Sequence, residues 1–264
     1  MRNLTRTSTL YEETDLKGEG FSYRIFAVST GARNAREDVL FAGGDPSNTP
    51  PIAVLSWCMQ GPSTIVVDSG LDPVPLPGNE DKFSQGKDDN TAFRLAEMGV
   101  NPDEVSALLL THLHHDHAEN VAAFPNAISY ISASGWEWLK REDGYAEKVF
   151  PRERLISYFS DHPERLCLVE DGQEFIPGIT AVHTGGHTPC SQMFLVSTDE
   201  GTLGFTGDEV MLYRSRTENR PVGLSMNPEG SKRALEIARE VCVSIFPSHD
   251  PLALGKQKIV HVPT

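Results

Sequence analysis

Short alternations of hydrophobic and polar residues run through the first part of the chain and predict strands. Residues 21–30 (FSYRIFAVST) alternate as a half-buried strand does. Two apolar runs follow at 51–58 and 63–68, and the Gln-Gly-Pro turn between them is typical of a hairpin. Residues 31–50 and 72–90 combine charges with glycine and proline, so we predict loops there.

The rest of the chain repeats one arrangement, in which a short apolar run ends in a cluster of polar residues. These runs are predicted strands, at 105–110, 127–132, 179–188, 201–208 and 241–250. Helical spacing of apolar residues predicts three helices, at 91–99, from about Ser134 to Lys148, and at 229–240. We expect variable loops at 150–165 and 211–226, which would form pocket walls or contacts in a homodimer.

Strands and helices interleave without a regular βαβ period. This pattern favours sheets covered by helices, an α/β (α+β) fold, over a doubly wound sheet. Only 15 residues follow His249, too few for another domain. We therefore predict a single domain over residues 1–264.

Charge and composition narrow the classes of function. A net charge of −14 opposes binding to nucleic acid. No run of ~18 apolar residues predicts a membrane span. The four cysteines lie far apart without a CxxC pair, which argues against a disulfide framework. We expect a cytoplasmic protein that acts on a small molecule.

The stretch THLHHDHAEN (111–120) holds four of the nine histidines. Similar polar clusters end the later strands, and residues at strand ends along one sheet edge can converge on one point. The converging candidates are His112, His114, Asp116, His117, His187, Asp208 and His249.

Mixed imidazole and carboxylate ligation suggests a pair of metal ions. His112 and His114 are two apart in an extended segment, so their rings project to one side. With His187 they would bind one metal. Asp116, His117 and His249 would bind the second metal, and Asp208 would bridge both. We expect two divalent ions, Zn²⁺ first, with Mn²⁺, Fe²⁺ or Co²⁺ left open.

Two metals about 3.5–4 Å apart hold a bridging hydroxide that is a nucleophile near neutral pH. One metal would polarise a substrate carbonyl, and the other would stabilise the leaving oxygen. Asp116 is expected to steer the proton of the hydroxide and pass it to the leaving group.

Other residues near these motifs receive plainer interpretations. His115 falls on the opposite side of the chain from His114, so we expect a structural or pocket-rim role. His183 is interpreted as a packed strand histidine, and Cys190 as a small buried side chain or pocket-floor residue. Asp68 can accept a hydrogen bond from a ligand histidine or cap a turn. Trp136 and Trp138 are expected in the core or a lid.

The segment HLHHDH resembles the HxHxDH signature of the metallo-β-lactamase superfamily. The stretches IVVDSG, GGHTPCS, FTGDE and PSHD follow in that family's order, and the match spans roughly residues 50–250. The resemblance implies a four-layer αβ/βα sandwich with the metal site at the sheet edges. It also implies that the seven ligands are divided between the two metals in the same way as the spacing suggests.

Among the branches of this superfamily, the chain looks most like the N-acyl-homoserine lactonases and pyridoxolactonase-type hydrolases. The β-lactamases proper lack the bridging aspartate, and persulfide dioxygenases use a single iron. Lactonases usually place a tyrosine three residues after the bridging aspartate, where this chain has Met211. Tyr213 is the candidate to contact the substrate carbonyl instead. Cys190 stands where many members have glycine.

The leading hypothesis is a dinuclear metal hydrolase of a small ester, with a lactone as the favoured substrate. The same metal pair can hydrolyse an amide, a lactam or a thioester, which is the alternative. A mononuclear iron redox protein and a non-catalytic binding protein are the remaining hypotheses.

Overall fold

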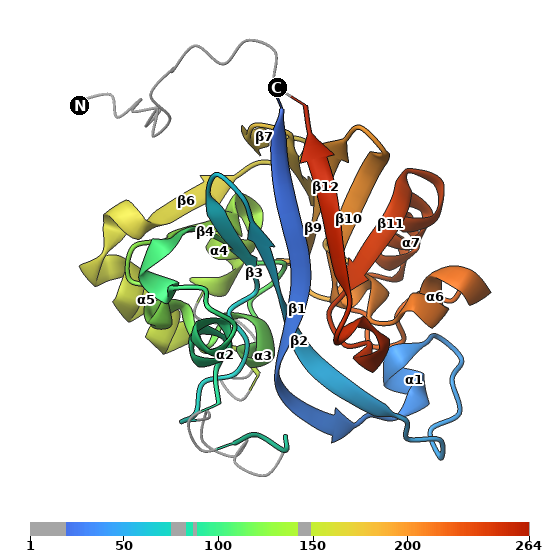
Figure 1. Ribbon diagram of the computed structural model, residues 1–264. Coiled ribbons are helices and arrows are strands. Elements are labelled where there is room, and N and C mark those ends of the chain that lie inside the picture. Colours follow the sequence, from blue (N-terminus) through green and yellow to red (C-terminus); the bar gives the residue numbers. More distant parts are fainter. Residues whose placement is uncertain (1–19, 75–82, 87–88, 142–148, 264) are drawn as a thin grey trace, which may run out of the picture.

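A computed structural model describes residues 20–74, 83–86, 89–141 and 149–263, which form two β-sheets with helices around them (Figure 1). The larger sheet has seven strands in the order β12-β1-β2-β3-β4-β5-β6. Its strands are β1 (Phe21–Asn34), β2 (Pro51–Gln60), β3 (Thr64–Val67), β4 (Val105–Leu109), β5 (Ile128–Ser132), β6 (Leu166–Val169) and β12 (Gln257–Val262).

The second sheet has five strands in the order β11-β10-β9-β8-β7. They are β7 (Glu174–Ile176), β8 (Ile179–His183), β9 (Gln192–Thr198), β10 (Gly201–Gly207) and β11 (Cys242–Pro247). The α-helices are α1 (Glu37–Leu40), α2 (Thr91–Glu97), α3 (His115–Ala118), α4 (Ala133–Leu139), α5 (Arg152–Asp161), α6 (Tyr213–Glu218) and α7 (Pro228–Glu240). Five short 3₁₀ turns cover Pro102–Glu104, Val121–Ala123, Pro163–Arg165, Asp208–Val210 and Pro251–Ala253.

The two sheets face each other across one hydrophobic core. Every second residue of β2 enters this core, including Trp57, because side chains alternate between the faces of a strand. The Trp57 ring meets Phe246 of the second sheet edge-on, with ring centroids 4.8 Å apart. Burying an aromatic side chain of this kind contributes about 2–3 kcal/mol. This core therefore holds the sheets together.

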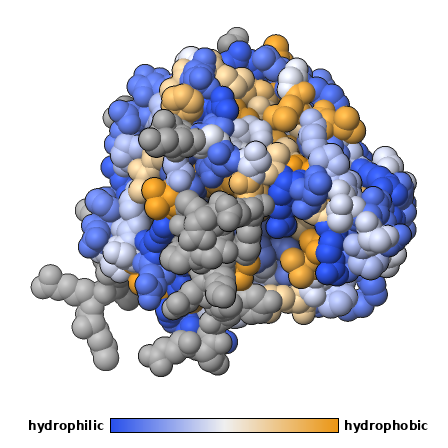
Figure 2. Space-filling model, turned by 90° about the horizontal axis from the view of Figure 1, so that it is seen from below, coloured by the Kyte–Doolittle hydropathy of each residue, from blue (hydrophilic) through white to orange (hydrophobic). Residues whose placement is uncertain are grey.

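The helices cover the outer faces of both sheets. Leu95 of α2, Trp136 of α4 and Phe159 of α5 pack on the seven-stranded sheet. Ala234 and Leu235 of α7 pack on the five-stranded sheet. The order helix, sheet, sheet, helix confirms the predicted αβ/βα sandwich. On the face seen from below (Figure 2), hydrophobic residues form small groups among hydrophilic ones.

Strand direction decides which chain segments meet at a sheet edge. Strands β3, β4, β5 and β6 run parallel, so their carboxyl ends share one edge of the larger sheet. In the second sheet, β10 runs parallel to β11, and both β8 and β10 run antiparallel to β9. The polar clusters that follow β4, β8, β10 and β11 therefore lie just beyond the carboxyl ends of these strands.

Several predicted boundaries are wrong. The predicted loop 31–50 contains the end of β1 and helix α1, because pairing with β2 continues to Asn34. The predicted loops 150–165 and 211–226 contain α5 and α6. The helix predicted from Ser134 to Lys148 ends at Leu139, and residues 142–148 lie outside the described part. Among described residues, no helix combines the length and apolar character needed to cross a bilayer.

Candidate metal centre

The HLHHDH segment leaves the seven-stranded sheet directly after β4. His114 keeps an extended conformation (φ −64°, ψ 155°) and caps helix α3, which carries Asp116 and His117. All of these side chains are buried. The change from extended chain to helix separates the two pairs of candidate ligands, as the alternation along the segment predicts.

The first group of ligand atoms joins the extended part of this segment to the loop after β8. His112, His114, His187 and Asp208 each offer an atom, and these atoms lie within 4.8 Å of one another. His114 Nδ1 is 3.0 Å from His112 Nε2 and 3.1 Å from His187 Nε2. These are the four residues that the sequence predicts for one metal.

The second group joins helix α3 to the end of β11. Asp116, His117 and His249 offer atoms within 4.8 Å of one another. His249 Nε2 lies 3.8 Å from the Asp116 carboxylate, and His117 Nε2 lies 3.9 Å from it. The same three residues are the expected set for the second metal.

Asp208 lies between the two groups and turns one oxygen to each. Its Oδ2 atom is 3.4 Å from His187 Nε2 in the first group. Its Oδ1 atom is 3.1 Å from His117 Nε2 and 3.0 Å from His249 Nε2 in the second. Ser248 Oγ donates a hydrogen bond to Oδ1 at 2.6 Å. This geometry suits a carboxylate that bridges two ions.

Gly207 allows Asp208 to reach this position. Its φ of 50° and ψ of −144° are accessible to glycine and strained for other residues. A Cβ atom at Gly207 would lie 2.6 Å from the side chain of Thr111, directly before His112. The missing side chain lets the end of β10 approach the end of β4, so the two sheet edges share one centre.

Hydrogen bonds on the outer side of the rings orient the histidines. His117 Nδ1 donates to Asp68 at 2.8 Å, which confirms the predicted contact of Asp68 with a ligand histidine. His249 Nδ1 donates to the Ala53 carbonyl at 2.8 Å, and His187 Nδ1 to the Leu224 carbonyl at 2.6 Å. Each Nδ1 donates in this arrangement, so each Nε2 atom faces the centre.

Burial keeps two of the histidines neutral. Burial, with the nearby His117 ring, lowers the pKa of His112 well below its usual value. Burial and the His187 ring have the same effect on the pKa of His114. Neutral imidazoles have the free lone pairs that metal binding requires.

In the second ligand group, the effect of burial on the pKa of a histidine is outweighed by carboxylates, which raise that pKa. Burial lowers the pKa of His117, but the carboxylates of Asp208 and Asp68 outweigh it and raise that pKa well above its usual value. Burial would raise the pKa of Asp208, but His249 and His117 hold it well below its usual range. Asp208 is therefore ionised, and a positive charge is favoured next to it.

The residues fit two divalent metal ions. His117 Nε2 is buried and lies 3.1 Å from Asp208 Oδ1, but no well-aligned hydrogen bond to a described residue satisfies it. A buried polar atom of this kind costs about 1–3 kcal/mol when nothing satisfies it. A cation between the converging nitrogens and carboxylates would satisfy it. The combined set of five imidazoles and two carboxylates is typical of Zn²⁺ and its neighbours in the first transition row.

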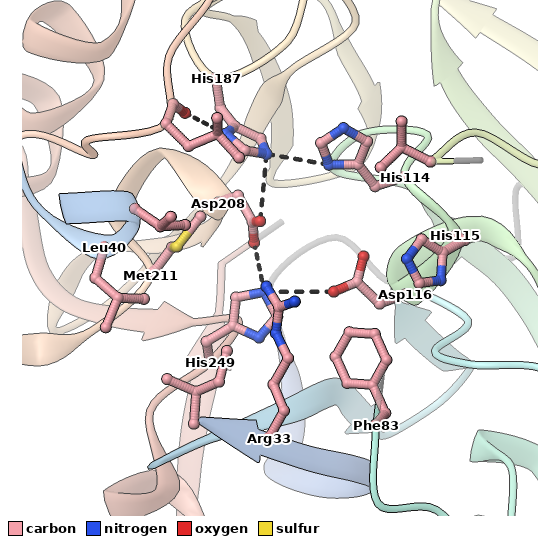
Figure 3. A pocket seen from close by; sticks show the side chains of 14 residues that line it. Arg33, Leu40, Phe83, His114, His115, Asp116, His187, Asp208, Met211 and His249 are labelled. Carbon is pink, nitrogen blue, oxygen red and sulfur yellow. Dashed lines mark hydrogen bonds and ion pairs between the residues drawn. The ribbon is translucent and has the colours of Figure 1, made fainter. Parts of the chain in front are cut away.

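A pocket opens over these ligands (Figure 3). Its cavity has a volume of about 90 Å³. Besides ligand residues, it is lined by Arg33, Val39, Leu40, Ile52, Phe83, His115, Val149, Met211 and Leu224. His115 is therefore at the pocket and outside both ligand groups, as expected for a rim residue. Arg33 and Phe83 fall within predicted loops, and the sequence pattern does not identify them as pocket residues.

Tyr213 lies away from the pocket in which a substrate carbonyl would bind. It is absent from the pocket lining, which contains Met211 instead. Tyr213 begins helix α6 and packs against the core between the sheets, with Lys256 over its ring at 5.7 Å. Burial raises the pKa of its hydroxyl to about 12. A role of Tyr213 at the substrate carbonyl therefore stays a prediction, without support from the pocket lining.

The other histidine and cysteine near the motifs have structural positions. His183 ends β8, and its Nε2 donates to the Pro189 carbonyl at 2.9 Å. Cys190 is buried in the helix-covered core, where burial raises the pKa of its thiol to about 11. Trp136 belongs to the same core, and Trp138 packs against it.

Comparison with known proteins agrees with this architecture. The sequence model of the metallo-beta-lactamase superfamily matches residues 52–241. The N-acyl homoserine lactonase AiiA of Bacillus thuringiensis subsp. kurstaki is 25% identical over 215 residues, which cover 74% of this chain and 80% of that protein. The lactonase AttM of Azorhizobium caulinodans is 25% identical over 177 residues, covering 62% and 65%.

Two solved structures share the fold. A quorum-quenching N-acyl homoserine lactone lactonase superposes with a TM-score of 0.69 at 18% identity, over 89% of this chain and 95% of that one. The dizinc quorum-quenching lactonase AidC, solved with a product bound, superposes with a TM-score of 0.65 at 15% identity, over 88% and 91%.

Proposed function

This chain belongs to the metallo-beta-lactamase superfamily, and we propose that it is a metal-dependent hydrolase that opens a small lactone. The observation that carries the proposal is the pair of ligand groups joined by Asp208 at the base of a pocket. The curated relatives named as N-acyl homoserine lactonases support the choice of a lactone. Zinc is the metal we favour, because imidazole and carboxylate ligands suit it.

Two divalent ions, when bound, supply Lewis acidity toward a carbonyl oxygen and activate a water molecule as the nucleophile. The protein residues fix where this chemistry takes place. Asp208 holds the two ligand groups at a set separation, and the hydrogen bonds to Asp68 and Ala53 hold the rings of His117 and His249. This preorganisation costs nothing at the moment of reaction.

Asp116 is the proposed proton carrier. Burial would raise the pKa of its carboxyl, but His117, His115 and His249 hold that pKa below its usual value, so the group is ionised. It lines the pocket, within reach of a substrate above the ligands. Asp116 takes a proton from the attacking water and returns it to the alkoxide oxygen that leaves when the lactone C–O bond breaks.

The walls of the pocket favour a compact substrate. Leu40, Ile52 and Met211 supply apolar surface beside the ligands. The cavity of about 90 Å³ is small beside the roughly 300–1,000 Å³ of a typical ligand pocket. A ring of five or six atoms fits this space better than a long chain.

A lactone panel combined with metal analysis tests the proposal. Purified protein is expected to hold two divalent ions per chain and to release acid from several small lactones in a pH-stat assay. Chelation should abolish the release, and added zinc should restore it. Protein with two ions that opens no lactone would contradict the lactonase assignment.

Other outcomes would favour the alternatives. Turnover of a chromogenic cephalosporin or a thioester, without turnover of lactones, would favour the lactam or thioester hydrolase. A single iron with oxygen consumption would favour the redox protein. The single domain over 1–264, the cytoplasmic location and a homodimer stay predictions.

A further inference from the structure

A bulge in β1 directs Arg33 toward the metal centre. Before the bulge, Ser29 pairs with Leu55; after it, Gly31 pairs with Val54, so β1 contains one extra residue. Arg33 consequently stands opposite Ile52, and both line the pocket. Without the extra residue, the neighbour of Arg33 would take this position, because a shift of one residue exchanges the faces of a strand.

The ring of Phe83 supports the Arg33 side chain. The backbone of Ala32 exchanges two hydrogen bonds with Ser84, of 3.0 and 2.7 Å, which hold residues 83–86 against β1. The Arg33 guanidinium stacks over the Phe83 ring, 4.9 Å from its centroid. The ring also meets His115 edge-on, with centroids 5.6 Å apart. In Figure 3 the Arg33 side chain points into the pocket, toward His249 and Asp116.

The charge of Arg33 has no carboxylate partner among the residues that the structure describes. Its buried Nε atom makes no hydrogen bond to them, and the stacking on Phe83 is its recorded contact. Neighbouring arginines differ, since Arg36 pairs with Asp38 and Arg214 pairs with Glu37.

The described acids that line the pocket are Asp116 and Asp208, and both belong to the ligand groups. Their negative charge would be balanced by two bound ions. Among the residues that the structure describes, no carboxylate is then left to pair with Arg33, so its charge is available to an anion in the pocket, although the whole chain has a net charge of −14. A guanidinium presents a planar fork that matches a carboxylate.

We propose that Arg33, held by Phe83, forms a carboxylate subsite beside the metal centre, and that the substrate is a small lactone bearing a carboxylate. This inference rests on the proposed lactonase function and specifies its substrate class. Water adds across the acyl C–O bond, so hydrolysis gives a hydroxy-dicarboxylate. The new carboxylate forms over the metal ligands while the original one stays on Arg33. Arg33 is thus a specificity residue that takes no part in bond breaking.

Binding of non-reacting anions tests the subsite without turnover. Zinc-loaded protein is titrated calorimetrically with succinate and glutarate, and with the monoamides succinamate and glutaramate. One carboxylate of each compound can occupy the metals, and only the diacids have a second for Arg33. We expect at least one diacid to bind roughly 10- to 100-fold more tightly than its monoamide, as for a charge-assisted bidentate pair. Equal affinity within both pairs in the unaltered protein would overturn the proposal.

Variants locate the effect. Arg33→Gln is expected to remove the preference for the diacid and to keep both metals, and Arg33→Lys to retain only part of it. Arg36→Gln is the matched control, since Arg36 is an exposed arginine paired with Asp38, and it should keep the full preference. A preference that survives in metal-loaded Arg33→Gln protein would show that the second carboxylate binds elsewhere.

Turnover separates this inference from the proposed function. The substrates are γ-butyrolactone-γ-carboxylate and its neutral carboxamide. The carboxylate should have the higher kcat/KM, and Arg33→Gln should lower that value about 10-fold or more, mainly through KM. The carboxamide should change less than about threefold. If neither lactone reacts but diacid binding still depends on Arg33, the lactonase function fails and the anion subsite stands. If both lactones react equally and ignore Arg33, the subsite fails and the lactonase function stands.

Discussion

The hydrogen bond between Asp68 and His117 controls which nitrogen of the histidine faces the metal centre. Asp68 is buried, with 2% of its surface exposed, and its Oδ2 accepts from His117 Nδ1 at 2.8 Å. Its Oδ1 accepts from the backbone N–H of Thr111, also at 2.8 Å. Asp68→Asn keeps the shape but replaces one acceptor by an NH₂ donor. Asparagine also tolerates the left-handed φ of 63° at this position.

The fixed N–H of Thr111 determines how the new amide turns. The amide oxygen must face Thr111, so the NH₂ group faces His117 Nδ1 and requires an acceptor there. His117 then carries its proton on Nε2, which removes the lone pair from the second ligand group. Losing a charge-assisted hydrogen bond costs about 1.5–3 kcal/mol, which corresponds to a loss of roughly 10- to 100-fold in affinity for the second metal.

A competition titration with a chromophoric chelator measures the two zinc affinities separately. We expect Asp68→Asn to weaken one zinc and leave the other within about threefold. Ser69→Ala is the control, because Ser69 Oγ donates to the backbone carbonyl of His117 at 3.0 Å and does not contact its ring. Equal weakening of both metals, or no weakening, would refute the tautomer argument.

Four further substitutions test other parts of the site. His114→Ala should lose metal and activity, whereas His115→Ala should keep two ions by mass spectrometry; equal metal loss would show that the HLHHDH segment is divided wrongly. Gly207→Ala should destabilise by about 1–3 kcal/mol in thermal unfolding, because its Cβ would meet Thr111 and its φ is positive; an unchanged midpoint would contradict this. Tyr213→Phe should keep kcat within about twofold, and a tenfold loss would place its hydroxyl at the substrate.

The positions of the metal-ligand candidates could be predicted because each one follows a strand. Parallel strands bring their carboxyl ends to one edge of each sheet, and the close approach of Gly207 to Thr111 joins the two edges, so that His112 and Asp208 meet. Alternation along the chain also separates His114 from His115, and His115 lies outside both groups of candidate ligands in the structure.

The pocket walls could not be predicted in the same way. A 3₁₀ turn at Asp208–Val210 places Met211 at the pocket and starts α6 at Tyr213, and counting residues does not reveal that rotation. Residues 31–34 look like the start of a loop because residues 31–50 combine charges with glycine and proline. Pairing with β2 and the bulge at Gly31 extend the strand, and these depend on tertiary contacts.

The ligand groups and the pair formed by Arg33 and Phe83 are therefore held by different parts of the fold. The ligand groups sit where both sheets end, and the core around Trp57 and Phe205 fixes those ends. Arg33 and Phe83 sit on an extension of β1 past its bulge and on residues 83–86, held there by the two hydrogen bonds between Ala32 and Ser84. Substitutions in this extension can change which anion is accepted without disturbing the core that positions the ligands.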